Sequence, residues 1–173
     1  PLVGMSRMVH DPAIRSSAPH TRWKIFGLCN RLHGISLDMF GTFMESWNDT
    51  YSVGVREMDE QHKRLLGYIG ALGELLVTQD NELIHELLAR ITDYGQQHFE
   101  AEERLLAKHG FPLEEQRAAH ERYIEWMAET NYEAVDGTLA LPAVYDYLRR
   151  WWTTHILGDD MQYKEFLNSR GVS

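Results

Sequence analysis

Apolar residues recur every three or four positions through much of the chain, and this spacing restricts the possible folds more than any other feature. Between residues 59 and 78 they form one stripe, made of Leu65, Leu66, Ile69, Leu72, Leu75 and Leu76. An α-helix has 3.6 residues per turn, so these side chains share one face. The sequence has no alternating strand pattern of any length. It therefore predicts an all-α protein.

Four such segments are separated by short breaks. The first runs to about Thr78, the second ends near "KHGFP", the third contains "EQRAAHERYIEWMAET", and the fourth contains "AVYDYLRRWWTTHI". Predicted caps and breakers mark their ends: Asp59 as N-cap of the first, Asp80 or Asn81 of the second, Gly110 as its stop, Pro112 in the first turn of the third, and Pro142 opening the fourth. Short connections between amphipathic helices predict an up-down antiparallel four-helix bundle with an N-terminal extension.

Residues 1–43 differ from the bundle predicted for residues 44–173. They contain Pro and Ser, have no sustained period, and carry a net charge of +3, whereas the remainder carries −12. We predict a loosely ordered extension. It could be a tail without function, an arm that binds a protein partner, or upstream sequence that is not translated, with Met39 or Met44 as the true start.

Composition excludes several classes of function. An acidic body argues against nucleic acid as a partner, because phosphate binding needs clustered Lys and Arg. No run approaches the ~20 apolar residues of a membrane span, so no membrane partner is expected. The single cysteine, Cys29, cannot form an internal disulfide. With no convincing signal peptide either, we expect a cytoplasmic protein.

Each predicted helix supplies one histidine in or near its apolar face: His62, His98, His120 and His155. Any one of them could be an ordinary core histidine. Four from four antiparallel helices can converge, however, and a carboxylate, Glu102, lies one turn from His98 on the same face. Imidazole and carboxylate ligands suit iron. The set predicts a metal site in the bundle core.

Asp160 is the second candidate carboxylate, in "HILGDD". Five residues separate it from His155, which is a rotation of about 140° on a straight α-helix. The two could share a face only if the helix ends or loosens, and Gly158 lies between them. The spacing alone does not choose between Asp159 and Asp160.

The remaining histidines are interpreted as lying outside the site. His10, His20 and His33 fall in the extension, and His85 points to a different side of its helix from His98. His109 is too far from His98 along the helix and sits at its end, where a cation interacts well with the helix dipole.

The motifs "YSVGVREMDEQHKRLL", "HFEAEERLL" with "KHGFP", an "HxxY" pair and "WWTTHI" followed by Asp160 resemble the haemerythrin-like family, in particular its bacterial single-domain type. The resemblance covers about residues 45–167. It implies a four-helix bundle around two non-haem irons, bridged by Glu102, Asp160 and an oxo or hydroxo group. One iron would take His62 and His98 and keep a position open for dioxygen.

The resemblance also implies three histidines on the other iron. Two of them match His120 and His155, but Gln116 stands where the third is expected. A Gln could offer its amide oxygen or hydrogen-bond a water that completes the iron. Alternatively, the second metal could be loosely held or absent.

We therefore expect a dioxygen-binding protein for storage, delivery or sensing, and not an enzyme. The alternative is a di-iron enzyme that reduces peroxide or nitric oxide or oxidises ferrous iron, which a labile second iron would favour. A third possibility is an interaction module whose partner binds residues 1–43. Ligands of this type argue against iron–sulfur and structural zinc sites. The predicted apolar lining comprises Phe99, Trp126, Trp151, Trp152 and Ile156.

Overall fold

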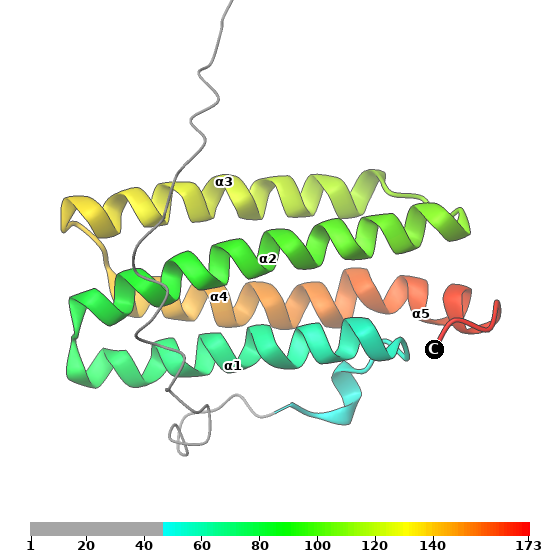
Figure 1. Ribbon diagram of the computed structural model, residues 1–173, viewed down its shortest axis with the longest axis horizontal. Coiled ribbons are helices and arrows are strands. Elements are labelled where there is room, and N and C mark those ends of the chain that lie inside the picture. The colour runs from blue at the N-terminus through cyan, green and yellow to red at the C-terminus, as the bar shows by residue number, and fades with distance from the viewer. Residues whose placement is uncertain (1–46) are drawn as a thin grey trace, which may run out of the picture. The chain divides into compact units, whose positions relative to one another are not determined.

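The computed structural model describes residues 47–173, and the predicted boundary between residues 43 and 44 lies outside them. Four long helices lie side by side, and each runs in the direction opposite to the one before it in the sequence (Figure 1). They are α1 (Arg56–Thr78), α2 (Asn81–His109), α3 (Glu114–Asp136) and α4 (Leu141–His155). A short 3-10 helix, η3 (Asp49–Tyr51), precedes them. The predicted all-α four-helix bundle is confirmed.

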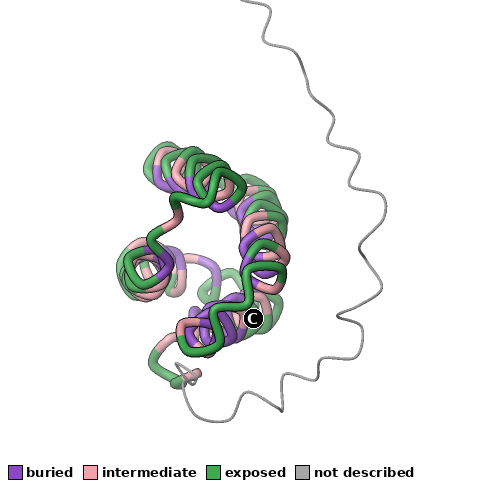
Figure 2. Tube along the Cα trace, turned by 90° about the vertical axis from the view of Figure 1, so that its left-hand side faces the viewer, coloured by how far each residue is buried: buried purple, intermediate pink, exposed green. Residues whose placement is uncertain are grey.

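Helix α4 continues through a π-helical turn, η4 (Ile156–Asp160), into α5 (Met161–Asn168). The buried sides of the helices face one another across the bundle (Figure 2). None of the described helices is long and apolar enough to cross a membrane.

Two predicted helix starts were wrong. Helix α1 begins at Arg56, and Asp59 lies inside its first turn, where its carboxylate accepts hydrogen bonds from Val53 N and Ser52 Oγ at 2.8 and 2.6 Å. Helix α3 begins at Glu114, two residues after Pro112. Pro112 instead follows the left-handed Gly110 that ends α2, which is a common position for a proline after a helix.

The other predicted ends agree with the structure. Asp80 is the N-cap of α2, and its carboxylate accepts a hydrogen bond from Leu83 N at 3.1 Å. Pro142 lies in the first turn of α4. The missing backbone N–H of a proline is harmless there, because first-turn N–H groups have no partner within the helix.

The core has two apolar clusters, with a polar layer between them. The smaller cluster includes Met58, Leu106 and Tyr163, and the larger one includes Leu65, Phe99 and Ile156. Each of α1, α2 and the continuous α4–α5 helix carries one buried polar residue in this layer. Along the sequence, that residue lies between a residue of one cluster and a residue of the other. These residues are His62, Glu102 and Asp160, all fully buried. A polar layer closed off on both sides must satisfy its charges internally.

Candidate metal centre

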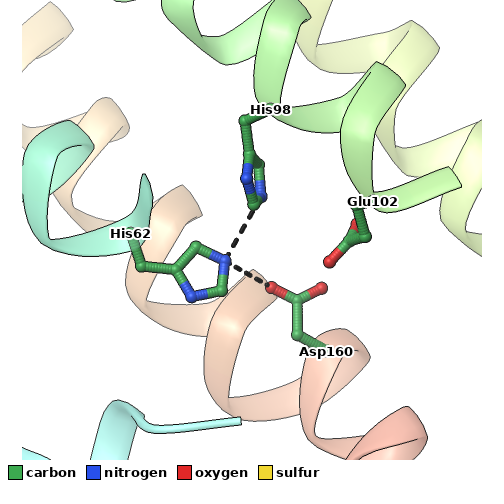
Figure 3. Close-up of side chains that lie close together, drawn as sticks. All are labelled: His62, His98, Glu102 and Asp160. Carbon is green, nitrogen blue, oxygen red and sulfur yellow. Dashed lines mark hydrogen bonds and ion pairs between the residues drawn. The ribbon is translucent and has the colours of Figure 1, made fainter. Parts of the chain in front are cut away.

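Six predicted ligands come together in the buried polar layer: His62, His98, Glu102, His120, His155 and Asp160. They fall into two groups that share Glu102. The first group contains His62, His98, Glu102 and Asp160 (Figure 3), and the second contains Glu102, His120 and His155. Within each group, the candidate ligand atoms lie within 4.8 Å of one another.

The four imidazoles meet in two pairs through their Nε2 atoms. The Nε2 atoms of His62 and His98 are 3.2 Å apart, and those of His120 and His155 are 3.1 Å apart. Each pair therefore brings two nitrogens to one point from two different helices.

The Nδ1 atoms of three of these histidines are occupied by acceptors. His98 donates to Gln61 Oε1 at 2.8 Å, His120 to Glu103 Oε1 at 2.9 Å, and His155 to Asp159 Oδ2 at 2.8 Å. In a neutral imidazole, a proton on Nδ1 leaves a lone pair on Nε2.

The pair formed by His120 and His155 thus has two Nε2 lone pairs facing each other at 3.1 Å. Such a contact is repulsive unless a cation or a proton lies nearby. Hydrogen bonds from Nδ1 to carboxylates are also the usual support of metal-bound histidines, because they fix the tautomer and the ring orientation. The donor set therefore fits a metal ion at this pair.

The two carboxylates extend from one histidine pair to the other. Asp160 Oδ2 lies 3.3 Å from His62 Nε2, while its Oδ1 lies 3.3 Å from His155 Nε2. Glu102 belongs to the first group, and its Oε2 lies 3.3 Å from His120 Nε2. A carboxylate whose oxygens face two different groups can bridge two metal ions.

Several buried atoms in the layer have no hydrogen-bond partner within the described protein: His62 Nδ1, Glu102 Oε2, Gln116 Oε1 and Asp160 Oδ2. Leaving such atoms unsatisfied costs free energy, about 1–3 kcal/mol each and more when charged. The short contacts of Glu102 and Asp160 with histidine nitrogens lack hydrogen-bond geometry. A cation between the carboxylate oxygens and the imidazoles would satisfy both sides.

Burial keeps the imidazoles of the layer in the neutral form that binds metal, and it opposes the ionisation of Asp160. Desolvation lowers the pKa of His62 to about 4 and that of His98 well below its usual value, so both imidazoles are neutral at pH 7. Burial raises the pKa of Asp160 strongly, and the neighbouring charge of Glu102 adds to this rise. Two close buried carboxylates repel each other, so a positive ion is needed before both can be charged.

The π-helical turn explains how the Asp160 side chain reaches the buried layer. In a π-helix, each residue bonds to the fifth along the chain, so a five-residue step closes about one turn. The turn Ile156–Asp160 therefore brings Asp160 under His155, which a straight α-helix would prevent. Asp159, the sequence alternative, has a side chain 47% exposed and supports His155 from outside the layer.

Gln116 is buried beside this layer, with an exposed fraction of 3%. Its Nε2 donates a hydrogen bond to Asp160 Oδ1 at 3.3 Å. At the position where the family resemblance implies a third histidine, Gln116 thus presents an amide N–H to the Asp160 carboxylate. An amide nitrogen of this kind is a donor and has no free lone pair for a metal.

Most of the predicted apolar lining surrounds the histidines. Phe99 stacks on His120 with ring centroids 3.9 Å apart, Trp151 stacks on His155 at 4.5 Å, and Trp152 lies 5.6 Å from His98. Ile156 is fully buried next to His155. These rings form an apolar wall along one side of the layer.

Trp126 was wrongly included in that lining, because it stacks on Tyr147 with ring centroids 3.8 Å apart. Six residues separate it from His120, a rotation of about 240° along the helix. As expected, His85 is exposed, and its Nε2 lies 2.7 Å from Ala134 O. His109 ends α2, outside both groups.

Three residues that support the layer were missed: Gln61, Glu103 and Tyr163. A fourth, Asp159, was considered only as the alternative to Asp160, and its contact with His155 Nδ1 was not predicted. The hydroxyl of Tyr163 donates to Glu102 Oε1 at 2.6 Å, with both side chains fully buried. Gln61, Glu103 and Asp159 each adjoin a proposed ligand in the sequence, as "QH", "EE" and "DD". This adjacency is a weak signal, because polar neighbours are common on exposed helix turns.

Comparisons with known proteins agree with this site. Residues 53–167 match the model of the Hemerythrin HHE cation binding domain. A bacteriohemerythrin from Stenotrophomonas maltophilia is 28% identical over 120 residues, which are 69% of this chain and 78% of that protein. A hemerythrin-like protein from Naegleria gruberi is 32% identical over 126 residues, 70% of this chain and 92% of that protein. The crystal structure of a wild-type hemerythrin has a similar fold, with a TM-score of 0.65 and 23% identity, covering 69% of this chain and 95% of that one.

Proposed function

Since the chain belongs to the haemerythrin family, with the buried histidine and carboxylate set of a non-haem di-iron protein, we propose that it binds two irons and, through them, dioxygen reversibly. The observation that supports this most strongly is the pairing of the four Nε2 atoms on either side of two shared carboxylates. An oxo or hydroxo bridge would complete the pair of irons. Oxygen storage, delivery or sensing would follow.

In this proposal, His62 and His98 hold one iron, and His120 and His155 hold the other. Asp160 and Glu102 bridge them. The first iron then has two imidazoles and two shared carboxylates from the protein, which leaves room for a further ligand. A bound pair of ferrous ions would supply the electrons with which dioxygen is reversibly captured.

The residues around the layer favour retention of dioxygen over its turnover. Phe99 and Trp152 stack with ring centroids 5.4 Å apart and cover His120 and His98. Apolar walls slow the delivery of protons, which would release reduced oxygen as a product. The hydroxyl of Tyr163 is held by Glu102, and burial raises the pKa of this tyrosine well above its usual value, so it is a poor acid.

The test is the iron content per chain together with the visible spectrum, before and after reduction and re-exposure to air. We expect two irons and oxo-to-iron charge-transfer bands that vanish on reduction and return in air. One iron or none, without returning bands, would contradict the proposal.

Gln116 favours a second candidate function, a di-iron enzyme that reduces peroxide or nitric oxide or oxidises ferrous iron. A donor set with one histidine fewer gives the second iron a replaceable ligand, as turnover requires. Sustained consumption of peroxide with a reductant, at a rate proportional to protein, would support this function over reversible binding.

The proposal includes a cytoplasmic location, which a chain with a single cysteine allows. It also includes a protein partner for residues 1–43. Cell fractionation tests the first point. Pull-downs with the full chain and with a chain lacking residues 1–43 test the second, and recovery of the same proteins by both would remove its basis.

A further inference from the structure

The Gln116 side chain ends beside Asp160, the carboxylate whose two oxygens face the two histidine pairs. Asp160 Oδ1, which accepts the Gln116 amide hydrogen at 3.3 Å, is also the oxygen that lies 3.3 Å from His155 Nε2. The other end of the amide, Oε1, is buried and has no partner. The protein therefore offers the second metal position two imidazoles, shared carboxylates and a nearby amide.

A surface pocket of about 340 Å³ opens onto Gln116. Its lining residues are Phe111, Pro112, Glu114, Glu115, Gln116, Asp159 and Gln162. Two of them contact the centre directly: Gln116 bonds to Asp160, and Asp159 accepts the Nδ1 hydrogen of His155. A small molecule in the pocket is thus separated from the second metal position by a single side chain.

The charge of the pocket restricts what can enter it. Glu114, Glu115 and Asp159 are acidic, and none of the lining residues is basic. Carboxylates around a pocket repel anions and leave small uncharged molecules unaffected. The unpaired Oε1 of the buried Gln116 amide can accept a hydrogen bond from a ligand such as hydrogen peroxide.

Resting on the proposed di-iron centre, we propose that the position of His120 and His155 binds a second small uncharged ligand, such as nitric oxide or hydrogen peroxide, which enters through the pocket at Gln116. This site is separate from the open position beside His62 and His98. The chain would hold two exogenous ligands at once, one on each metal.

Titration of the reduced, iron-loaded full-length protein with nitric oxide under anaerobic conditions tests this site, with iron per chain measured on the same samples. We expect two irons and two nitric oxide molecules per chain. The Gln116→His variant should keep two irons, retain them better against a chelator, and bind one nitric oxide. One nitric oxide per chain in the unchanged protein would overturn the inference.

The route is tested by filling the pocket without touching a proposed ligand. Gln162→Trp adds a large side chain to the lining, and Gln97→Trp adds the same side chain to an exposed position on α2, outside the pocket. Stopped-flow mixing should show that Gln162→Trp slows the second binding step and not the first, while Gln97→Trp changes neither. Equal second-step rates in the two variants would contradict entry through this pocket.

The oxidised protein tests the preference for uncharged ligands. Azide, a small anion, should bind once per chain, and a second azide would contradict this preference. Two irons with one nitric oxide would overturn the second site and leave the di-iron function intact. Fewer than two irons would overturn both.

Discussion

The hydrogen bond from Tyr163 to Glu102 can be removed with little other change. Replacing Tyr163 by Phe deletes the hydroxyl and keeps the ring, which lies edge-on to Phe111 with centroids 6.2 Å apart. The deleted donor is 2.6 Å from Glu102 Oε1, and both side chains have an exposed fraction of 0%. No water can readily replace the hydroxyl at such a site.

The expected loss follows from the charge of Glu102. Burial alone would raise the pKa of Glu102, but the close contact with His120 and the neighbouring His98 and His155 lower it overall, so the carboxylate is ionised. A hydrogen bond to a charged group contributes about 1.5–3 kcal/mol, and an abandoned buried acceptor costs a similar amount. We expect Tyr163→Phe to lower the free energy of unfolding of the metal-free protein by about 1.5–3 kcal/mol.

Urea unfolding followed by circular dichroism measures this difference, with the slope of the transition unchanged. Tyr132→Phe is the matched control, because Tyr132 is 71% exposed and its hydroxyl faces water. The control should change stability by no more than about 0.5 kcal/mol. If the two variants have the same midpoint, the Tyr163 hydroxyl does not stabilise a charged Glu102. In the iron-loaded protein, loss of this support should weaken iron retention by about 10–100-fold.

Three other predictions follow from the same structure. His98→Ala should remove most of the iron because a buried ligand is lost, whereas His85→Ala, an exposed histidine on the same helix, should keep it; equal iron contents would show that His98 is not a ligand. The metal-free protein should lose stability as pH falls from 6.5 toward 4. Over this range His62 becomes protonated in the unfolded chain, whereas burial lowers its pKa in the folded protein to about 4. This shift is worth roughly 3 kcal/mol, and the His62→Gln variant should show a correspondingly smaller loss in urea titrations at each pH. Gly73→Ala should destabilise the bundle by about 1–3 kcal/mol, since an added Cβ would lie 2.9 Å from the ring of Tyr145; an unchanged melting curve would refute this.

Sequence reasoning identified the helices well because helical periodicity is a local property. A stripe such as Leu65, Ile69 and Leu72 needs only its own helix to be recognised. The starts of α1 and α3 were misplaced for a related reason. Asp59 and Pro112 are residue types that favour a helix start. In the structure, however, Asp59 accepts hydrogen bonds from the loop before α1, and Pro112 follows the glycine that ends α2.

The composition of the site was also visible in the sequence, since one histidine per helix and two acids stand among apolar residues. By itself, the sequence thus determined an all-α bundle and a set of buried donors suited to iron. It did so because residue types and their period within one helix are properties of the chain alone.

Only the tertiary structure decided how these donors meet. The π-helical turn at Ile156–Asp160 places Asp160, and not Asp159, in the buried layer. The packing of α3 against α4 places the Nε2 atoms of His120 and His155 3.1 Å apart. The Tyr163 hydroxyl reaches Glu102 across 61 positions of sequence. Such contacts depend on how each helix is rotated and shifted against its neighbours, and that is settled by packing of the whole core, which no single helix encodes.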